Sequence, residues 1–311
     1  MILAADIGGT KVLLGLEDQG KLIAQHRYPS VDFSDFDSLL ATYLADAAID
    51  VTQIRGGCLA VAGPVADDGL TAKITNLPWH IDTQALSQRF GLPPLRLVND
   101  FVAAAQGAVI APASEHVTLQ PGEPLTQSPC LVVGAGTGLG MAIAIPEAGD
   151  WRILPGEGGH IAFAPADAEQ VGLLNFLRAR HGRVIWEHVV SGPGLTAIHE
   201  FLSGQTASPE QITAAALAGN ACCEYRALNL FLAAYGAYAG DMALATLARG
   251  GVYLAGGIAG RLLTLLPHSR FLAAFNDKAG HAALTVKMPL HVVTDPLLGL
   301  RGALHLATRH R

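Results

Sequence analysis

The sequence predicts an α/β protein of two lobes. Half of its 311 residues are apolar and only 15% are charged, so the chain can bury two cores. Apolar runs typical of strands alternate with runs of helical spacing through residues 1–110, which indicates an α/β lobe with a mixed sheet. A strand, a glycine-rich turn and a second strand occupy 2–16, and the same plan recurs at 131–145. This repeat predicts a duplicated second lobe that faces the first.

The first lobe begins with strands around a glycine-rich turn. Apolar residues 2–4 and 12–16 flank the turn Asp6–Lys11, and a third strand follows at 22–28. Glycines let a backbone approach a ligand closely, although an ordinary hairpin would also use them. Asp6 favours the functional interpretation, because a buried carboxylate at a strand end needs a partner such as a metal ion or its water.

Helical spacing and turn residues predict the other elements of the first lobe. Ser34 is expected to open a helix whose apolar face comprises Phe36, Leu39, Leu40, Tyr43, Leu44 and Ala47. The remaining predictions are a buried strand at 57–62, a helix capped by Asp82 and ending at 90–91, a strand at 95–98, and a helix from Phe101 with an alanine face.

Asn99 and Asp100 stand between that last strand and its helix. Backbone N–H groups are unpaired there and the helix dipole is positive, so both residues are also suited to a simple helix cap. The glycine-rich turns at 6–11 and 134–140 favour a functional role for these residues over a simple cap. A carboxylate between two candidate phosphate loops is where a kinase would keep its base.

The second lobe repeats these features. Its predicted elements are strands at 131–133 and 141–145, a glycine-rich loop at 154–160, a helix at 169–180, a tight loop at 191–194 that opens a helix at Leu195, a helix from Ser208 and Pro209, a helix at 221–249, strands at 250–258 and 289–293, and a closing helix at 299–309. We expect a small lobe of residues 1–110, closed by a C-terminal helix at 297–311, and a large lobe of residues 111–296.

Composition excludes several classes of function. A net charge of −6 argues against nucleic acid as a partner. The four cysteines, Cys58, Cys130, Cys222 and Cys223, lack C-x-x-C spacing, which fits a reducing compartment without structural zinc. The N-terminal apolar run is too short for a signal peptide, and the run at 231–240 is too short to span a membrane. We therefore expect a cytoplasmic protein that does not enter a membrane.

Three apolar strands run into glycine turns, at Gly8, Gly134 and Gly256. One such turn is often only a bend. Together they fit a nucleotide, with the hydroxyls of Thr10 and Thr137 and the loop amides on phosphate oxygens. The pattern is not a P-loop, because no G-x-x-x-x-G-K-[ST] occurs, and it is not a dinucleotide fingerprint, because strands follow the turns.

Six segments together resemble the bacterial ATP-dependent glucokinase family. They are Asp6–Thr10, Val98–Phe101, Gly134–Gly140, Leu154–His160, Ser191–Gly194 and Leu254–Ile258. Their order and spacing agree with the family along nearly the whole chain. The resemblance implies the ribonuclease H-like fold of actin, Hsp70 and the hexokinases, in which a cleft separates a small lobe from a large one.

The same resemblance implies roles for single residues. Asn99, Asp100, Glu157, His160 and Glu187 would bind the sugar, with Asp100 as the catalytic base. ATP would contact Ala5, Asp6, Ile7, Gly8, Gly9 and Thr10 in the first loop, Gly136, Thr137 and Gly138 in the second, and Gly256 and Gly257 near the adenosine. Mg²⁺ would bind the ATP phosphates and be held partly through water by Asp6. Members of the family are often homodimers.

Each site residue also has a purely structural interpretation. His160 could be a structural histidine or a metal ligand, although no cysteine cluster follows it. Glu157 could be a solvated loop acid and Glu187 an exposed helix residue. Two positions depart from the family pattern: Lys11 stands where several members carry Asn, and Ala162 where an acid is expected. Trp79 and Trp186 are expected to pack in the interior.

These observations predict ATP-dependent phosphorylation of D-glucose at its 6-hydroxyl. A hexose is neutral and rich in hydroxyls, which carboxylates, Asn and His recognise well. The alternatives are a kinase for mannose, fructose or an amino sugar, a sugar-sensing regulator on the same fold, and an ATPase. A regulator of this kind usually adds an N-terminal helix-turn-helix, whereas this chain begins at its first strand.

Overall fold

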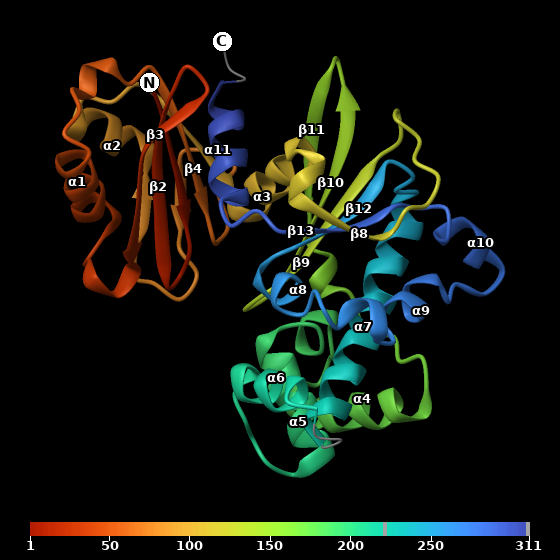
Figure 1. Cartoon of the computed structure of the whole chain (residues 1–311). Helices are drawn as coiled ribbons and strands as arrows, with labels where there is room; N and C mark the ends of the chain where they lie inside the picture. The colour runs from red at the N-terminus through yellow and green to blue at the C-terminus, as the bar shows by residue number, and fades with distance from the viewer. Residues whose placement is uncertain (220–222, 309–311) are drawn as a thin grey trace. The chain divides into compact units, whose positions relative to one another are not determined.

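The chain folds into two compact units, each with its own sheet and helices. The computed structural model describes residues 1–219 and 223–308. Unit 1 comprises Met1–Ala111 and Asp295–Arg311, and unit 2 comprises Pro112–Thr294 (Figure 1). The predicted α/β class is confirmed. Cys222, the predicted helix start at residue 221 and the predicted end of the closing helix at 309–311 lie outside the described residues.

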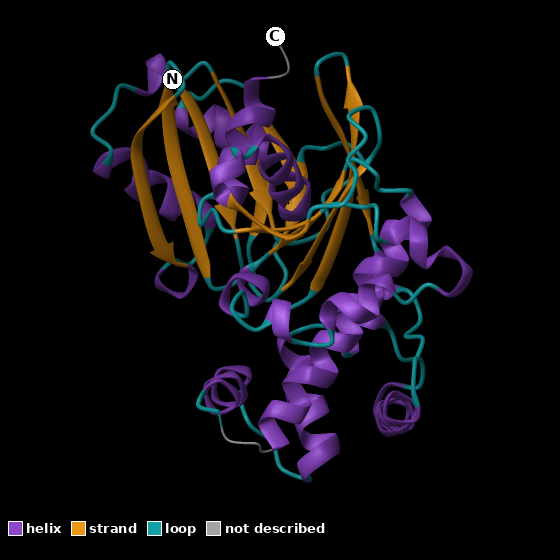
Figure 2. Cartoon of the chain, turned by 45° about the vertical axis from the view of Figure 1, so that its right-hand side comes forward, coloured by secondary structure: helices purple, strands orange, loops and turns teal. Residues whose placement is uncertain are grey.

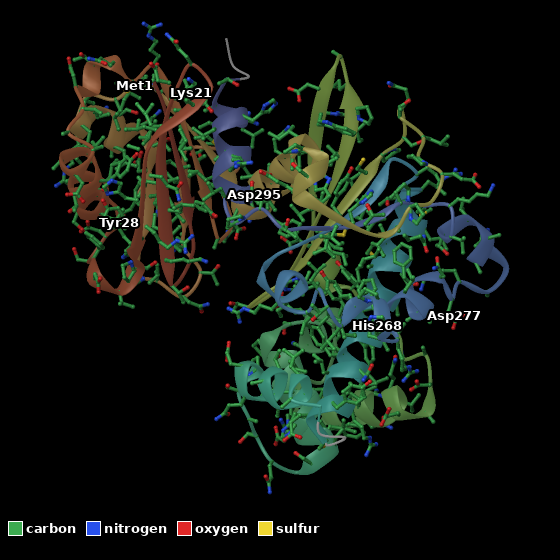
Figure 3. All side chains as sticks on the ribbon, in the orientation of Figure 1. Met1, Lys21, Tyr28, His268, Asp277 and Asp295 are labelled. Carbon is green, nitrogen blue, oxygen red and sulfur yellow. The ribbon has the colours of Figure 1, made fainter. Side chains whose placement is uncertain are left out.

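Unit 1 is built on a five-stranded mixed sheet of order β3-β2-β1-β4-β7. Its strands are β1 (Ile2–Ile7), β2 (Lys11–Asp18), β3 (Lys21–Pro29), β4 (Gly56–Val61) and β7 (Leu95–Asn99). β1, β4 and β7 run parallel, and Ile7, Val61 and Asn99 are in register across them. The carboxyl ends of these three strands therefore share one edge of the sheet. Met1 and Lys21, labelled in Figure 3, mark the opposite end, and Tyr28 lies at the end near Lys11.

Helices cover both faces of this sheet. The helices are α1 (Phe36–Asp46), α2 (Thr83–Phe90), α3 (Asp100–Ile110) and α11 (Leu298–Thr308), with short 3₁₀ turns η1 (Ser30–Asp32) and η2 (Val51–Gln53). The apolar face predicted for α1 is buried in a core with β1 and β2, and Trp79 is buried there as predicted. On the other face, Ala103 of α3 and Leu300 and Ala303 of α11 pack together in a second core with residues of β1, β4 and β7.

Two details of unit 1 differ from the sequence prediction. The cap of α1 is Asp35, whose side chain accepts from the Ser38 N–H, and Ser34 instead bonds to that carboxylate. A two-stranded sheet, β5 (Thr71–Lys73) with β6 (His80–Asp82), was not predicted. Its strands hold three residues each, too few to show an alternating pattern. Asp82 caps α2 as expected, through the N–H groups of Gln84 and Ala85.

Helices α3 and α11 pack against each other (Figure 2), and glycines lie at the contact. A Cβ on Gly302 would collide with the carbonyl oxygen of Ala103, and one on Gly107 with that of Leu298. Both obstacles are backbone atoms, which cannot rotate away.

Gly302→Ala is therefore expected to destabilise the protein by about 1–3 kcal/mol or more, as overpacking does. Urea unfolding followed by circular dichroism measures this change. Gly260→Ala is the control, because a Cβ there has no atom within 4 Å. Equal stability of the two variants would contradict the contact.

Unit 2 contains a six-stranded sheet of order β11-β10-β9-β12-β13-β8. The strands are β8 (His116–Gln120), β9 (Cys130–Ala135), β10 (Leu139–Glu147), β11 (Asp150–Gly156), β12 (Gly251–Ala255) and β13 (Leu290–Val293). β9 and β10 form the predicted second hairpin, and β9 runs parallel to β12. Two corrections concern strands: β8 was not predicted, and residues 154–156, expected in a loop, end β11.

The helices of unit 2 are α4 (Ala168–His181), α5 (Gly192–Ser203), α6 (Pro209–Leu217), α7 (Cys223–Thr246), α8 (Gly257–Arg261), α9 (Phe271–Asn276) and α10 (Ala282–Thr285). The 3₁₀ turns in the described part of this unit are η3 (Ala113–Glu115), η4 (Gly158–His160), η5 (Trp186–His188), η6 (Leu266–His268) and η7 (Ala279–His281). Most residues of α7 are buried, and Trp186 is buried in the same core, as predicted. No helix among the described residues is both long and apolar enough to cross a membrane.

Two helix boundaries in unit 2 correct the prediction. α5 begins at Gly192 rather than Leu195, because Ser191 caps it through the Gly194 N–H. The third glycine turn leads into helix α8 and not into a strand. The helix start predicted at Ser208 and Pro209 is present in α6, and the structure adds a capping box between Ser208 and Gln211.

Candidate functional site

The first glycine turn joins β1 to β2 at the carboxyl edge of the unit 1 sheet. The Gly8 N–H donates to the Lys11 carbonyl over 3.0 Å, and Ser30 Oγ donates to the Gly8 carbonyl over 3.0 Å. A Cβ on Gly9 would lie 3.1 Å from the Thr75 carbonyl oxygen, so a larger residue would crowd the turn. Thr10 and Lys11 are exposed. The side chains of Ala5 and Ile7 are fully buried, so these two residues can offer a ligand only their backbone.

Asp6 precedes this turn, and its carboxylate points toward α11. A Cβ on Gly299 would lie 2.6 Å from Asp6 Oδ2, so only glycine leaves room for the carboxylate there. Burial raises the pKa of Asp6, and the positive charges of Lys11 and Arg27 oppose the shift. A carboxylate in this position is stabilised by a cation.

Asn99 and Asp100 lie at the carboxyl end of β7, where α3 begins. Asn99 Oδ1 accepts from the Phe101 N–H over 2.9 Å, so Asn99 is a helix cap, and its Nδ2 donates to the Gly63 carbonyl over 3.2 Å. These bonds fix the plane of the amide. Asp100 Oδ1 accepts from the same Phe101 N–H over 2.9 Å.

The Asp100 carboxyl is perturbed by its surroundings. Burial is the largest cause and the negative charge of Asp6 the next, and together they raise the pKa of Asp100 to about 6, against the opposing hydrogen bonds from the Phe101 N–H and Asn99. Unit 1 therefore holds two interacting carboxyl groups at one edge of its sheet. A group with a pKa near neutrality can accept a proton at physiological pH.

The second glycine turn joins β9 to β10 in unit 2. The Gly136 N–H donates to the Gly138 carbonyl over 2.8 Å, which closes the turn, and the Gly192 N–H donates to the Gly136 carbonyl over 2.8 Å. Thr137 at the tip is exposed. The hairpin is thus tied to the start of α5.

Glu187 lies in η5 and reaches the base of this hairpin. Its Oε2 accepts from the Leu139 N–H over 2.8 Å, and a Cβ on Gly138 would lie 2.7 Å from that oxygen. Ser191 Oγ donates to the Glu187 carbonyl over 2.7 Å. Glu187 is therefore anchored, and is not the exposed helix acid that the structural interpretation expected.

Glu157 precedes η4 and His160 ends it, in the loop after β11. Their side chains are 88% and 59% exposed, and His160 Nδ1 lies 3.5 Å from Glu157 Oε2. The loop packs closely: a Cβ on Gly159 would collide with the Leu139 carbonyl oxygen, and one on Gly158 with Met141 Sδ. Leu139 thus contacts both the segment that carries Glu157 and the segment that carries Glu187.

The third glycine turn lies between β12 and α8. Gly256 has a φ of 85°, and a Cβ there would lie 2.9 Å from the Ala135 carbonyl oxygen at the end of β9. Ala255 pairs with Gly134 across the sheet, so the second and third turns lie side by side. Gly257, the first residue of α8, is exposed.

The structure adds neighbours that sequence reasoning did not find. The Tyr238 hydroxyl is buried beneath η4, 2.7 Å from where a Gly158 Cβ would lie. His181 and His188 stack beside Glu187 with ring centroids 4.0 Å apart. Burial, foremost, and the charge of His181 lower the pKa of His188, which Glu187 opposes. Tyr238 sits within an apolar helix and His181 is the last residue of α4, so neither carries a sequence signal.

No group of three or more His, Cys, Asp or Glu residues within 1–219 and 223–308 is arranged to hold a metal ion. Ala162 is exposed and bridges to Ile185 near η5.

A family model described as Glucokinase matches residues 3–310. A glucokinase from a Nostoc species is 36% identical over 342 residues, covering 99% of each chain. The crystal structure of a glucokinase from an Antarctic psychrotroph superposes with a TM-score of 0.85 and 32% identity, covering 98% of this chain and 99% of that one.

A more distant structure shares the fold. A ROK-family glucokinase from Streptomyces griseus, solved with glucose and AMPPNP, has a TM-score of 0.68 and 20% identity and covers 98% of each chain. The two-lobed fold predicted from the sequence is confirmed by these likenesses.

Proposed function

This chain belongs to the glucokinase family, and we propose that Asp100 is the general base of its reaction. The activity is the ATP-dependent phosphorylation of D-glucose to glucose 6-phosphate. One observation carries the proposed role: Asp100 is the titratable group at the carboxyl edge of the unit 1 sheet whose pKa lies at about 6. It can therefore be ionised near neutral pH and still take up a proton.

Asp100 would accept the proton of the 6-hydroxyl as that oxygen attacks the γ-phosphoryl group. Its Oδ1 is occupied by the Phe101 N–H, so Oδ2 is the oxygen available to the sugar. Phosphoryl transfer depends on positioning and on stabilising charge, to which a base adds about 10²–10⁴ in rate. The fixed amide of Asn99, beside Asp100, would bind a neighbouring hydroxyl.

Glu157, His160 and Glu187 of unit 2 would bind further sugar hydroxyls. Carboxylates accept O–H hydrogen bonds strongly, and the imidazole of His160 offers a donor and an acceptor. A site that satisfies several hydroxyls rejects an analogue lacking one of them by roughly 10⁴-fold, because the protein groups would be left unpaired. This chemistry favours a sugar that offers every hydroxyl the site is built to bind.

The glycine turns would bind ATP. The turn at 8–10 and the turn at 136–138 present backbone N–H groups and threonine hydroxyls suited to phosphate oxygens, and Gly256 and Gly257 would lie near the adenosine. Asp6 fits a role in holding Mg²⁺ through water: its carboxylate is buried and repels Asp100, so a cation would relieve both costs. When bound, the ion neutralises charge on the phosphates.

A substrate panel tests this function. The protein is incubated with Mg²⁺, ATP and one sugar at a time, namely glucose, mannose, fructose, glucosamine or N-acetylmannosamine, and ADP release is measured by a coupled assay. Glucose is expected to have the highest kcat/KM, with little ADP formed when sugar is omitted. A higher kcat/KM for another hexose would overturn the selectivity. ATP hydrolysis independent of sugar would favour an ATPase, and binding of glucose without turnover would favour a sensor.

Two further features stay predictions. A homodimer would show as twice the chain mass in light scattering. Independence from zinc would show as full activity after dialysis against a zinc chelator and return of Mg²⁺.

A further inference from the structure

The proposed function assigns Glu187 to a sugar hydroxyl and the hairpin of β9 and β10 to the ATP phosphates. Glu187 is held in place by that same hairpin. Oε2 accepts from the Leu139 N–H over 2.8 Å. Among the residues that the structure describes, Oε1 accepts no hydrogen bond, so it is the oxygen left for a ligand. The backbone of Glu187 is fixed as well, by Ser191 Oγ. One side-chain oxygen is thus an anchor and the other is free.

The anchor exists only because residue 138 is glycine. An added Cβ at Gly138 would lie 2.7 Å from Glu187 Oε2, 3.4 Å from its Cδ and 4.0 Å from Oε1. Apart from the flanking residues, the three nearest atoms in the described part of the chain all belong to this carboxyl group. It is the end of a flexible side chain, so it would swing away rather than force the backbone to move. A methyl group at this position would therefore displace the Glu187 carboxylate and leave the fold intact.

We propose that Gly138 is a positioning residue for sugar binding: it admits the Glu187 carboxylate to the Leu139 N–H, and this contact aims Oε1 at a glucose hydroxyl. The inference rests on the proposed function. Gly138, which lies in the turn between β9 and β10, would thus affect the affinity for glucose in addition to any role toward ATP.

The hairpin itself supplies a matched control. Gly136 lies two residues away in the same turn, and a Cβ there would have no atom within 4 Å. Neither glycine has a positive φ, so alanine strains neither backbone. Gly136→Ala and Gly138→Ala thus add the same methyl group to the same hairpin, and only the second meets Glu187.

The experiment measures the dissociation constant of glucose by isothermal titration calorimetry in the absence of nucleotide, for the wild type, both alanine variants, Glu187→Ala and the double variant Gly138→Ala/Glu187→Ala. Thermal unfolding is followed for each to confirm folding. We expect Gly138→Ala to weaken glucose binding at least tenfold, about the loss of one well-placed hydrogen bond to a charged group. Gly136→Ala should stay within twofold of the wild type.

The double variant separates a direct effect from one through Glu187. If Gly138 acts through that carboxylate, Gly138→Ala adds nothing to the loss already caused by Glu187→Ala. Additive losses, or equal affinities of the two single glycine variants, would overturn the proposal. Wild-type protein that binds no glucose would instead contradict the proposed function, so the two failures are distinguishable.

Discussion

Asp100→Asn is expected to lower kcat by about 10²–10⁴-fold, because asparagine cannot take the proton of the attacking hydroxyl. The amide oxygen can still accept the hydrogen bond that Asp100 Oδ1 now receives from the Phe101 N–H. Glucose binding should therefore stay within a few fold of the wild type, which equilibrium titration measures on the same preparation. The matched control is Asp82→Asn, at the cap of α2, which should retain full turnover. Wild-type turnover in Asp100→Asn would remove Asp100 from the mechanism.

The same substitution should make the protein more stable at neutral pH. The pKa of Asp100 is raised in the folded state to about 6 from 3.8, so between those values the folded protein binds more protons than the unfolded chain. Stability therefore falls as the pH rises through this window, and the cost is complete above about pH 6. At 1.36 kcal/mol per pKa unit it is at most about 3 kcal/mol, which asparagine would recover. An unchanged or lower melting temperature at pH 7 would contradict the cost of burying the Asp100 charge beside Asp6.

The second large effect is on the pH dependence of the rate. Because Asp100 must be ionised to act as a base, kcat/KM for glucose should fall tenfold per unit below about pH 6 and so about 100-fold by pH 4. Rates are measured at saturating Mg²⁺ and ATP, with circular dichroism to confirm folding at each pH. ATP also titrates in this range, and the residual activity of Asp100→Asn controls for it. An acid limb that persists unchanged in Asp100→Asn would assign the ionisation to another group.

The position of Asp100 could be predicted because the sequence around it is locally consistent. A short apolar strand, an Asn-Asp pair and an alanine-rich helix follow in order, and the structure places each within a residue of its expected bounds. Asn99 caps α3, so the interpretation of this residue as a helix cap was correct. A cap does not exclude a site, since the helix start that Asn99 caps also holds Asp100 at the sheet edge.

Other features could not be predicted because they depend on contacts between distant residues. The bond between Glu187 and the Leu139 N–H spans 48 residues and involves a backbone group, so no side-chain motif encodes it. The raised pKa of Asp100 arises first from burial and then from the charge of Asp6, which precedes it by most of unit 1. The cap of α1 was mispredicted for a local reason. Asp35 and Ser34 are adjacent and both favoured as caps, and only the geometry of α1 selects Asp35.

The most direct test of the account is the rate of the chemical step itself. Product release limits kcat in many enzymes, so a steady-state rate can conceal the loss of a base. Rapid-quench measurement of a single turnover, with enzyme in excess over radiolabelled ATP and with saturating glucose and Mg²⁺, isolates phosphoryl transfer. The account predicts that Asp100→Asn slows this step by about 10²–10⁴-fold while glucose remains bound. A single-turnover rate equal to that of the wild type would contradict it.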